Sequence, residues 1–376
     1  MLYGFLRIVI VPAIWLWVTV LPGAAAQPGP GLLKAKQSAE AKGYRFLTSR
    51  DEIIARAKKE GQLRVLYGVY PATYKGFAET FVKKYPFITI QRAEEITGSD
   101  ASQRFVQELQ AGIAGEKWDA IYLSGPFYNN YLSHLAKFDI AGMAAEGVLQ
   151  IPSQMIDPDN RDIVAAGSAL DVIAYNPRLL RRDLIPRTWE NLLRPELKGK
   201  KFVMDIDPAA VAALTPAWGL EKVLDFARKV REQEPIWGRG HSRMLASLAA
   251  GEYALHGGTN YNSVMRLKMK NPKADVEPVL AEPVPARLHE ATGILAGAKN
   301  PHVALLWIEH MTTPEAQKFL DEVEPYKSSI FAPGSILKKD VEGKKVSVAA
   351  WRFFVERGEI EKQIVRAYGF PSTERK

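Results

Sequence analysis

Short apolar segments alternate with amphipathic segments along the first half of the chain, and this alternation restricts the fold to the α/β class. One amphipathic segment carries apolar residues at positions 74, 77, 78, 81 and 82, which is the spacing of one helix face. A second such helix is predicted over 105–113. The predicted strands of this half are Leu63 to Tyr67, Phe87 to Ile90 and Ala120 to Leu123. We therefore expect a mainly parallel sheet with helices on both faces.

The second half repeats this order with different residues, which predicts a second α/β lobe. Its predicted strands are Asp171 to Tyr175, Lys201 to Met204 and Tyr253 to His256. Its predicted helices are a short one capped by Thr188, one over 220–230, one over 242–250 with Ser242 as N-cap, and a late one that begins at Thr313-Pro314. A Pro-rich stretch over 277–285 is expected to cross between the lobes.

The first 26 residues predict export from the cytoplasm. Arg7 is followed by an apolar run from Ile8 to Leu21 and by Ala24-Ala25-Ala26, the layout of a cleaved secretory signal peptide. An uncleaved membrane anchor is the alternative, although the run is shorter than the ~20 residues of a spanning helix. The expected organisation is a signal peptide (1–26), a flexible leader (27–43), a first lobe (44–160), a second lobe (161–275), a return to the first lobe (276–325) and a C-terminal helical tail (326–376).

Composition narrows the compartment and the partners. The chain has 376 residues and no cysteine, so it offers neither disulfides nor a thiol for catalysis or for a lipid anchor. A freely diffusing monomer in the periplasm of a Gram-negative bacterium is the simplest interpretation. The net charge of +8 could favour binding to a nucleic acid or to an acidic membrane surface, but basic and acidic residues are interspersed along the chain. We therefore expect a solvated basic surface and no nucleic-acid partner.

Candidate ligand residues follow the predicted strands, where an α/β sheet places its ligands. Glycines there allow close approach of the backbone, and hydroxyls add donors and acceptors for a small polar or anionic solute. Each such loop is also compatible with an ordinary turn. The candidates in these loops are Tyr70, Thr97, Gly98, Ser99, Ser124, Gly125, Asp205 and Asp207.

Two further candidate segments lie in the second half. Arg239, His241 and Arg243 stand beside glycines at the start of a predicted helix, where they could hold a carboxylate or phosphate together with the helix dipole. Asn260 and Tyr261 follow a predicted strand. An exposed turn and a core phenol are the competing interpretations of the two segments.

Several chemistries lack a signature in the sequence. The six histidines have no H-E-x-x-H and no short metal-ligand spacing, and Walker A, G-x-S-x-G and G-x-G-x-x-G patterns are absent. We expect no cofactor and no resident metal. A secreted hydrolase that uses Asp205 or Asp207 with His256 remains a rival of another class, as does a receptor-like interaction protein that signals through a membrane partner.

Five segments resemble the periplasmic solute-binding proteins of ABC importers, in the branch typified by ferric-iron-binding proteins. The segments are Phe81 to Ile88, Ala174 to Pro177, Pro186 to Leu193 running on to Lys198-Gly199-Lys200, Ala249 to Tyr253, and Ala298 to His302. The resemblance implies a type II periplasmic binding fold with two lobes, a ligand cleft between them, no catalysis, and docking on a permease in the inner membrane.

The cargo is less specified by this resemblance. Iron-binding members hold ferric ion with two adjacent tyrosines, whereas the matching place here is Asn260-Tyr261-Asn262, with one phenol. Ferric ion prefers several anionic oxygen ligands. We therefore expect a small anionic or polar organic solute, with ferric iron or an iron complex, held in part by Tyr261, as the alternative.

Overall fold

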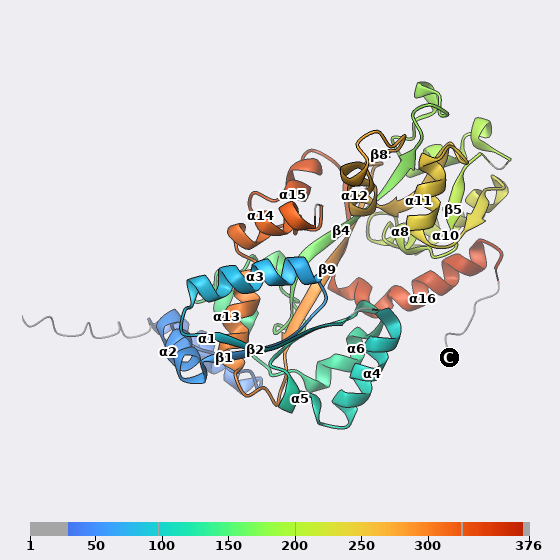
Figure 1. The fold of residues 1–376 in the computed structure, drawn as a ribbon. Coiled ribbons are helices and arrows are strands. Elements are labelled where there is room, and N and C mark those ends of the chain that lie inside the picture. The colour runs from blue at the N-terminus through green and yellow to red at the C-terminus, as the bar shows by residue number, and fades with distance from the viewer. Residues whose placement is uncertain (1–28, 97, 200, 325, 371–376) are drawn as a thin grey trace, which may run out of the picture.

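Two lobes share one continuous sheet in the computed structural model, which describes residues 29–370 except 97, 200 and 325 (Figure 1). The strand order is β2-β1-β3-β9-β4-β7-β5-β6, with β10 paired to β9 and β8 paired to β4. The predicted signal peptide lies outside the described residues. Within those residues, no helix combines the length and the apolar character needed to cross a membrane.

The first lobe contains the outer strands that the sequence predicted. Strands β1 and β2 pair in parallel, as do β1 and β3. The strands are β1 (Gln62–Tyr67), β2 (Thr89–Glu95) and β3 (Ala120–Tyr122). The helices are α1 (Pro30–Ala41), α2 (Arg50–Glu60), α3 (Pro71–Lys84), α4 (Gly98–Gln110), α5 (Ala114–Lys117), α6 (Tyr128–Tyr131), α7 (Ile140–Ala145), α13 (Pro301–Met311) and α14 (Pro314–Val323), with short 3-10 helices η1 (Gly125–Phe127), η2 (Leu132–His134) and η3 (Ser153–Met155).

The second lobe repeats the arrangement, since β5 pairs in parallel with both β6 and β7. Its strands are β5 (Val203–Asp205), β6 (Ile236–Gly238), β7 (Leu255–Asn260) and β8 (Glu277–Val279). Its helices are α8 (Ala209–Ala212), α9 (Thr215–Trp218), α10 (Leu220–Glu232), α11 (His241–Ala249) and α12 (Tyr261–Lys270), with 3-10 helices η4 (Arg182–Leu184), η5 (Trp189–Leu193) and η6 (Pro195–Leu197).

Two long strands cross between the lobes. Strand β4 (Val164–Tyr175) pairs antiparallel with β9 (Val284–Ile294) through one half and with β7 through the other. The far end of β9 pairs antiparallel with β3 and its near end in parallel with β10 (Val346–Ala349). The Pro-rich stretch over 277–285 was expected to make a crossing itself; instead it contains β8 and leads into β9, which crosses between the lobes.

Each face of the sheet in each lobe has its own apolar core. In the first lobe, α13 is buried from Val303 to Met311 and packs its Trp307 edge-on against Phe81 of α3. In the second lobe, Trp189 is fully buried below the sheet. The helix containing Trp189 is capped reciprocally by Thr188 and Asn191, as the sequence predicted for Thr188.

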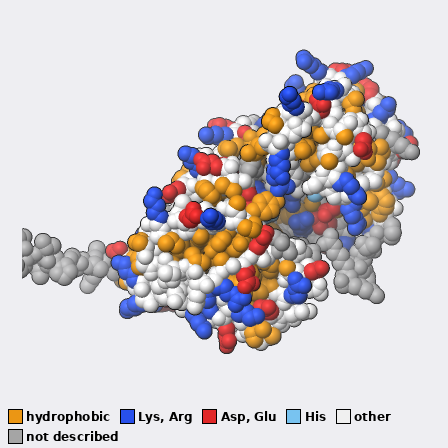
Figure 2. All heavy atoms as spheres, viewed as in Figure 1, with side chains coloured by type: hydrophobic (Ala, Val, Ile, Leu, Met, Phe, Trp, Pro, Cys, Tyr) orange, Lys and Arg blue, Asp and Glu red, His pale blue; other side chains and the backbone are white. Residues whose placement is uncertain are grey.

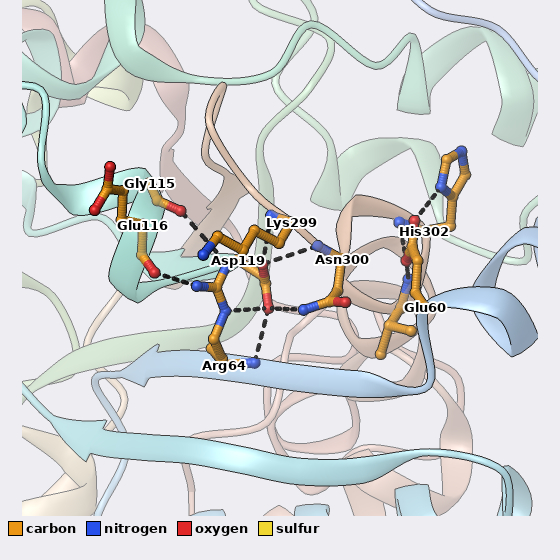
Figure 3. Close-up of polar contacts among 9 residues, drawn as sticks. Glu60, Arg64, Gly115, Glu116, Asp119, Lys299, Asn300 and His302 are labelled. Atoms are coloured by element: carbon orange, nitrogen blue, oxygen red, sulfur yellow. Dashed lines mark hydrogen bonds and ion pairs between the residues drawn. The ribbon is translucent and has the colours of Figure 1, made fainter.

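The segment Ala298 to His302 has a clear structural role, shown in Figure 3. The backbone N–H groups of Lys299 and Asn300 each donate to Oδ1 of Asp119 at 3.0 Å. Arg64 donates to the same carboxylate from Nε at 3.0 Å and from Nη2 at 2.6 Å. Both side chains of this pair are almost completely buried. The loop before α13 is thereby attached to strands β1 and β3 of the sheet.

Helix α16 (Trp351–Ala367), which follows α15 (Ile336–Asp340), contacts both lobes. At its start, Phe354 stacks on Tyr128 of the first lobe with ring centroids 5.4 Å apart. Beyond its end, Tyr368 packs 4.7 Å from Trp237 of the second lobe. Figure 1 shows α16 running from the junction of the lobes along the second lobe. It is a third connection beside the two crossing strands.

Two local predictions are wrong. Residues 30–41 of the predicted flexible leader form helix α1, because Pro30 occupies its first turn and Ala39 is buried against the first-lobe core. Ser242 does not cap α11; Gly240 does, and Ser242 lies inside the first turn. Thr313 does cap α14, accepting from the N–H of Ala316 at 3.3 Å.

Candidate functional site

A cavity of about 600 Å³ lies between the lobes, with walls from both. Figure 2 shows the hollow, with Lys and Arg side chains gathered at it. It lies at the carboxyl ends of β1, β6 and β7, where parallel strands deliver their loops. The lining residues are Tyr70, Ala169, Arg239, Gly240, His241, Ser242, Arg243, Asn260, Asn262, Ser263, Arg266, Arg287, His289 and Lys327.

Some cations of the cavity are neutralised by their own carboxylates. Arg287 on β9 holds Asp171 through two hydrogen bonds of 2.8 Å and also donates to Oδ1 of Asn260 at 2.8 Å. Lys327 lies 2.9 Å from Glu324. These paired cations fix the crossing strands and the floor of the cavity.

Three arginines of the cavity have no such partner among the described residues. No carboxylate oxygen lies within 4 Å of the guanidinium of Arg239, Arg243 or Arg266 in that part of the chain. Arg243 donates to the backbone oxygen of Arg239 at 2.8 Å, and Arg266 donates to the hydroxyl of Tyr70 at 2.5 Å. No Asp or Glu is among the described residues that line the cavity, so the charges of these three arginines are uncompensated there.

Tyr70 connects the two walls. Its backbone N–H donates to Oε1 of Glu324 at 2.7 Å, which holds it in the first lobe at the start of α3. The centre of its ring lies 5.1 Å from Nζ of Lys327 and 5.6 Å from the guanidinium carbon of Arg266. Such a ring can stack on a flat solute while its neighbours supply charge.

Two helices of the second lobe begin at the cavity. Both α11 and α12 start without a side-chain cap. Their first turns line the cavity through residues 241–243 and 262–263. Because the first N–H groups of a helix have no partner within it and carry the positive end of its dipole, both starts favour an anion in the cavity.

A polar cluster lies behind α11. Oδ2 of Asp205, which is buried, lies 3.5 Å from Nδ1 of His241. Burial raises the pKa of Asp205. His256 is completely buried, and burial lowers its pKa to about 3, so it stays neutral. A neutral, solvent-inaccessible imidazole cannot exchange protons with a solute, so the geometry does not support the hydrolase rival.

The structure brings five of the residues singled out from the sequence together in the cavity: Tyr70, Arg239, His241, Arg243 and Asn260. Ser124 and Gly125 line a smaller neighbouring cavity of about 120 Å³, which shares Arg287 and His289 with the first.

The other candidates lie elsewhere. Tyr261 donates its hydroxyl to Oδ2 of Asp340 at 3.0 Å and lines a different cavity. Asp205 lies beneath α11, and Asp207 is exposed and accepts from the N–H of Ala209 at 3.2 Å. Gly98 is exposed at the start of α4, while Thr97 and the side chain of Ser99 lie outside what the structure describes.

Sequence reasoning missed four basic residues of the cavity wall: Arg266, Arg287, His289 and Lys327. Arg287 and His289 lie two residues apart on a crossing strand, so their side chains point to the same face, a pattern that could have been noticed. Arg266 lies in the second turn of α12. The sequence search considered only the loops that follow strands, so it did not include this helical position. Lys327 lies in the segment that follows α14 and lines the cavity. No local sequence pattern indicates that this segment comes to the cavity.

The lining suits an anion better than a bare ferric ion. Among the described residues, no three His, Cys, Asp or Glu side chains are grouped so that they could hold a metal ion. Tyr70 is the one phenol among the described lining residues, and its neighbours are cations that would repel a metal. A ferric ion would have to bring most of its anionic oxygen ligands with it.

Comparisons with known proteins bear on this geometry. The profile described as "Bacterial extracellular solute-binding protein" matches residues 119–357. No curated protein matches significantly. Among solved structures, similarity extends to iron-bound HitA from Pseudomonas aeruginosa (17% identity, 82% of this chain, 99% of that chain, TM-score 0.60), to Trichodesmium FutA in complex with iron and citrate ligands (17%, 82%, 99%, 0.62) and to a putative extracellular solute-binding protein from Bordetella parapertussis (11%, 82%, 98%, 0.65). At these identities the likeness confirms the expected two-lobed type II periplasmic binding fold.

Proposed function

The chain belongs to the bacterial extracellular solute-binding protein family, and on this premise we propose that it is the periplasmic, monomeric binding component of an ABC importer that captures a small anionic solute between its lobes. The observation that carries the choice of solute is the lining of the cavity: within the part of the chain that the structure describes, Arg239, Arg243 and Arg266 have no carboxylate partner and no Asp or Glu lines the wall. No bond is made or broken in this function; the bound form docks on a membrane permease.

Both lobes contribute to the proposed site. Tyr70 belongs to the first lobe, and Arg239, Arg243 and Arg266 belong to the second. An anion that bonds to both walls stabilises the arrangement in which they face each other, because it interacts less well when they are apart. The permease then recognises the protein with its lobes closed.

An iron complex is the second candidate cargo, and what the solved relatives bind favours it. HitA is described as iron-bound, and Trichodesmium FutA as holding iron and citrate ligands. The cationic lining supports iron only as a negatively charged chelate, in which carboxylates of the chelator occupy most of the metal's coordination positions. Both candidate cargoes, the small anionic solute and the iron chelate, are therefore anions with more than one negative charge.

A thermal-shift screen of residues 27–376 tests the proposal. The panel contains organic acids, phosphorylated compounds, ferric citrate and ferric ion with a weak chelator. A ligand at one hundred times its Kd stabilises the fold by about 2.7 kcal/mol, which a melting curve detects. We expect stabilisation by anions and a loss of it in Arg266→Gln. Stabilisation by ferric ion with the weak chelator but by none of the anions, or by no solute in the panel, would contradict the proposed function.

A further inference from the structure

Glu290 has an unusual backbone conformation for its place in the fold. Its φ is +56°, and among the described non-glycine residues with a positive φ it is the one that lies inside a strand, the crossing strand β9. The register of β4 and β9 pairs Ala165 with Ala291 and Gly167 with His289, and within the described residues it skips Glu290. A non-glycine residue in this region of φ is disfavoured by a factor of about five to thirty, so its surroundings have to hold it there.

At the same point β4 is attached to another segment. The carbonyl oxygen of Ala166 accepts a hydrogen bond of 2.7 Å from Nε2 of Gln317, and the N–H of Ser168 donates to the carbonyl oxygen of Lys327 at 3.1 Å. A Cβ atom on Gly167 would lie 2.9 Å from this carbonyl oxygen, so a larger residue would displace the backbone of Lys327. The segment that carries Lys327 is therefore packed against the crossing strands where their pairing is interrupted.

The carboxylate of Glu290 interacts with two basic residues of the cavity wall. Its side chain is 6% exposed, and Oε1 lies 2.7 Å from Nδ1 of His289. Burial alone would raise the pKa of Glu290, but His289 and Lys327 outweigh burial and lower it. Burial alone would likewise lower the pKa of Lys327, but Glu290 and Glu324 outweigh it and raise it. Neither Oε1 of Glu290 nor Nδ1 of His289 has a well-aligned hydrogen-bond partner in the described part of the chain, so charge attraction holds this pair.

Glu290 and a bound anion would draw on the same basic groups. His289 and Lys327 line the cavity between the lobes, whereas Glu290 lines the smaller neighbouring cavity. We propose that Glu290 is a positioning residue that couples the cavity to β9: its carboxylate holds the bend of β9 in the free protein, and an anionic solute that attracts His289 and Lys327 releases this bend. The released backbone can leave the left-handed region, which changes the angle between the lobes. The coupling to a solute rests on the proposed function, but the hold of the carboxylate on the bend does not.

The hold on the bend is tested in the free protein. A dye pair at Lys75→Cys on α3 and Glu221→Cys on α10 reports the distance between the lobes. Glu290→Gln keeps the shape of the side chain and removes its charge, so we expect it to add a second population of about a tenth of the molecules or more to the distance distribution. The matched control is Glu322→Gln, an exposed glutamate of α14 with the same change of charge, which should leave the distribution unchanged. If Glu290→Gln does not fold, His289→Gln tests the same pair from its more exposed side.

The backbone strain is tested separately by urea denaturation. Glu290→Ala and Glu290→Gly both remove the carboxylate, but only glycine adopts a φ of +56° without strain. Glu290→Gly should therefore unfold at the higher urea concentration of the two. At Leu288, a neighbouring residue of β9 without a positive φ, the order should be reversed, because glycine weakens an ordinary strand more than alanine does. A midpoint for Glu290→Ala that equals or exceeds that of Glu290→Gly would contradict the strained bend.

The coupling is tested by adding citrate, ferric citrate and the other anions that stabilise the protein in the thermal-shift screen. We expect each to shift the distance distribution of the unaltered protein, and the shift to fall by about half or more in Glu290→Gln, where the bend is already released. An equal shift in both proteins, or a free distribution that Glu290→Gln leaves unchanged, would overturn the coupling, while stabilisation by an anion would leave the proposed function standing. If no anion stabilises the protein, the proposed function and the coupling both fail, and the measurements on the free protein still decide whether Glu290 holds the bend.

Discussion

The hydroxyl of Tyr70 accepts a hydrogen bond of 2.5 Å from Nη1 of Arg266, joining α3 of the first lobe to α12 of the second across the cavity. The bond is exposed, so its net contribution is about 0.5–1 kcal/mol. That is enough to change the ratio of two lobe arrangements by a factor of about two to five. A solute that binds Arg266 has to compete with this contact or include it.

Replacing Tyr70 by Phe should therefore shift the free protein toward arrangements with the lobes farther apart. The chain has no cysteine, so a dye pair can be placed cleanly at Lys75→Cys on α3 and Glu221→Cys on α10. We expect the mean distance between the dyes to increase in Tyr70→Phe and to stay the same in Tyr253→Phe. An unchanged distance distribution in Tyr70→Phe would show that the hydrogen bond does not hold the lobes together.

The sequence predicted the strands and helices of each lobe where burial is periodic. Strand β1 and helix α3 appear within a few residues of the predicted positions because their apolar patterns are local. The parallel pairing of the outer strands followed from their alternation with helices. The long antiparallel crossing of β4 and β9 did not, because which strands pair at the junction depends on contacts about 120 residues apart.

The ion pair of Arg64 and Asp119 should dominate the stability of the first lobe. Replacing Arg64 by Met leaves the Asp119 carboxylate buried without its charge partner, which costs about 3–5 kcal/mol. We expect urea denaturation to show a loss of this size. The exposed pair of Lys117 and Glu108 supplies the control, since Lys117→Met should cost at most about 1 kcal/mol. Equal losses in the two variants would contradict the role of burial.

His256 should make the protein less stable in acid. Burial lowers its pKa to about 3, so the unfolded chain takes up a proton as pH falls below about 6.5 while the folded chain does not. The stability contributed by neutral His256 is present above pH 6.5 and is lost progressively toward pH 3. In His256→Gln the unfolding free energy should fall less steeply between pH 6.5 and pH 4. Parallel pH profiles for the two proteins would show that His256 is not held neutral.

Tyr261 should not contact the solute. Burial and the neighbouring Asp340 raise its pKa, which disfavours the phenolate that a ferric ion needs. We expect Tyr261→Phe to bind every ligand of the screen within twofold of the unaltered protein and to lose about 0.5–1.5 kcal/mol of stability with its hydrogen bond. A visible phenolate-to-metal absorption band that appears with iron and disappears in this variant would restore Tyr261 as a ligand.

Part of the cavity wall could be foreseen because strand ends converge. Tyr70, Arg239, His241 and Asn260 stand beside strand ends of an α/β sheet, where position along the chain implies position in the cavity. Tyr261 also follows a strand, but the first turn of α12 carries its side chain toward α15. Asn260 and Tyr261 are adjacent in the chain, yet only Asn260 faces the cavity. The local sequence does not indicate which of the two side chains does so.

The most direct test of the account is a crystal structure of the protein with the solute that co-purifies with it from the periplasm. The account predicts density for an anion in the cavity between the lobes, within hydrogen-bonding distance of Arg239 or Arg243 on one side and of Arg266 or Tyr70 on the other. Density at a different place, or a metal ion coordinated mainly by protein side chains, would contradict it.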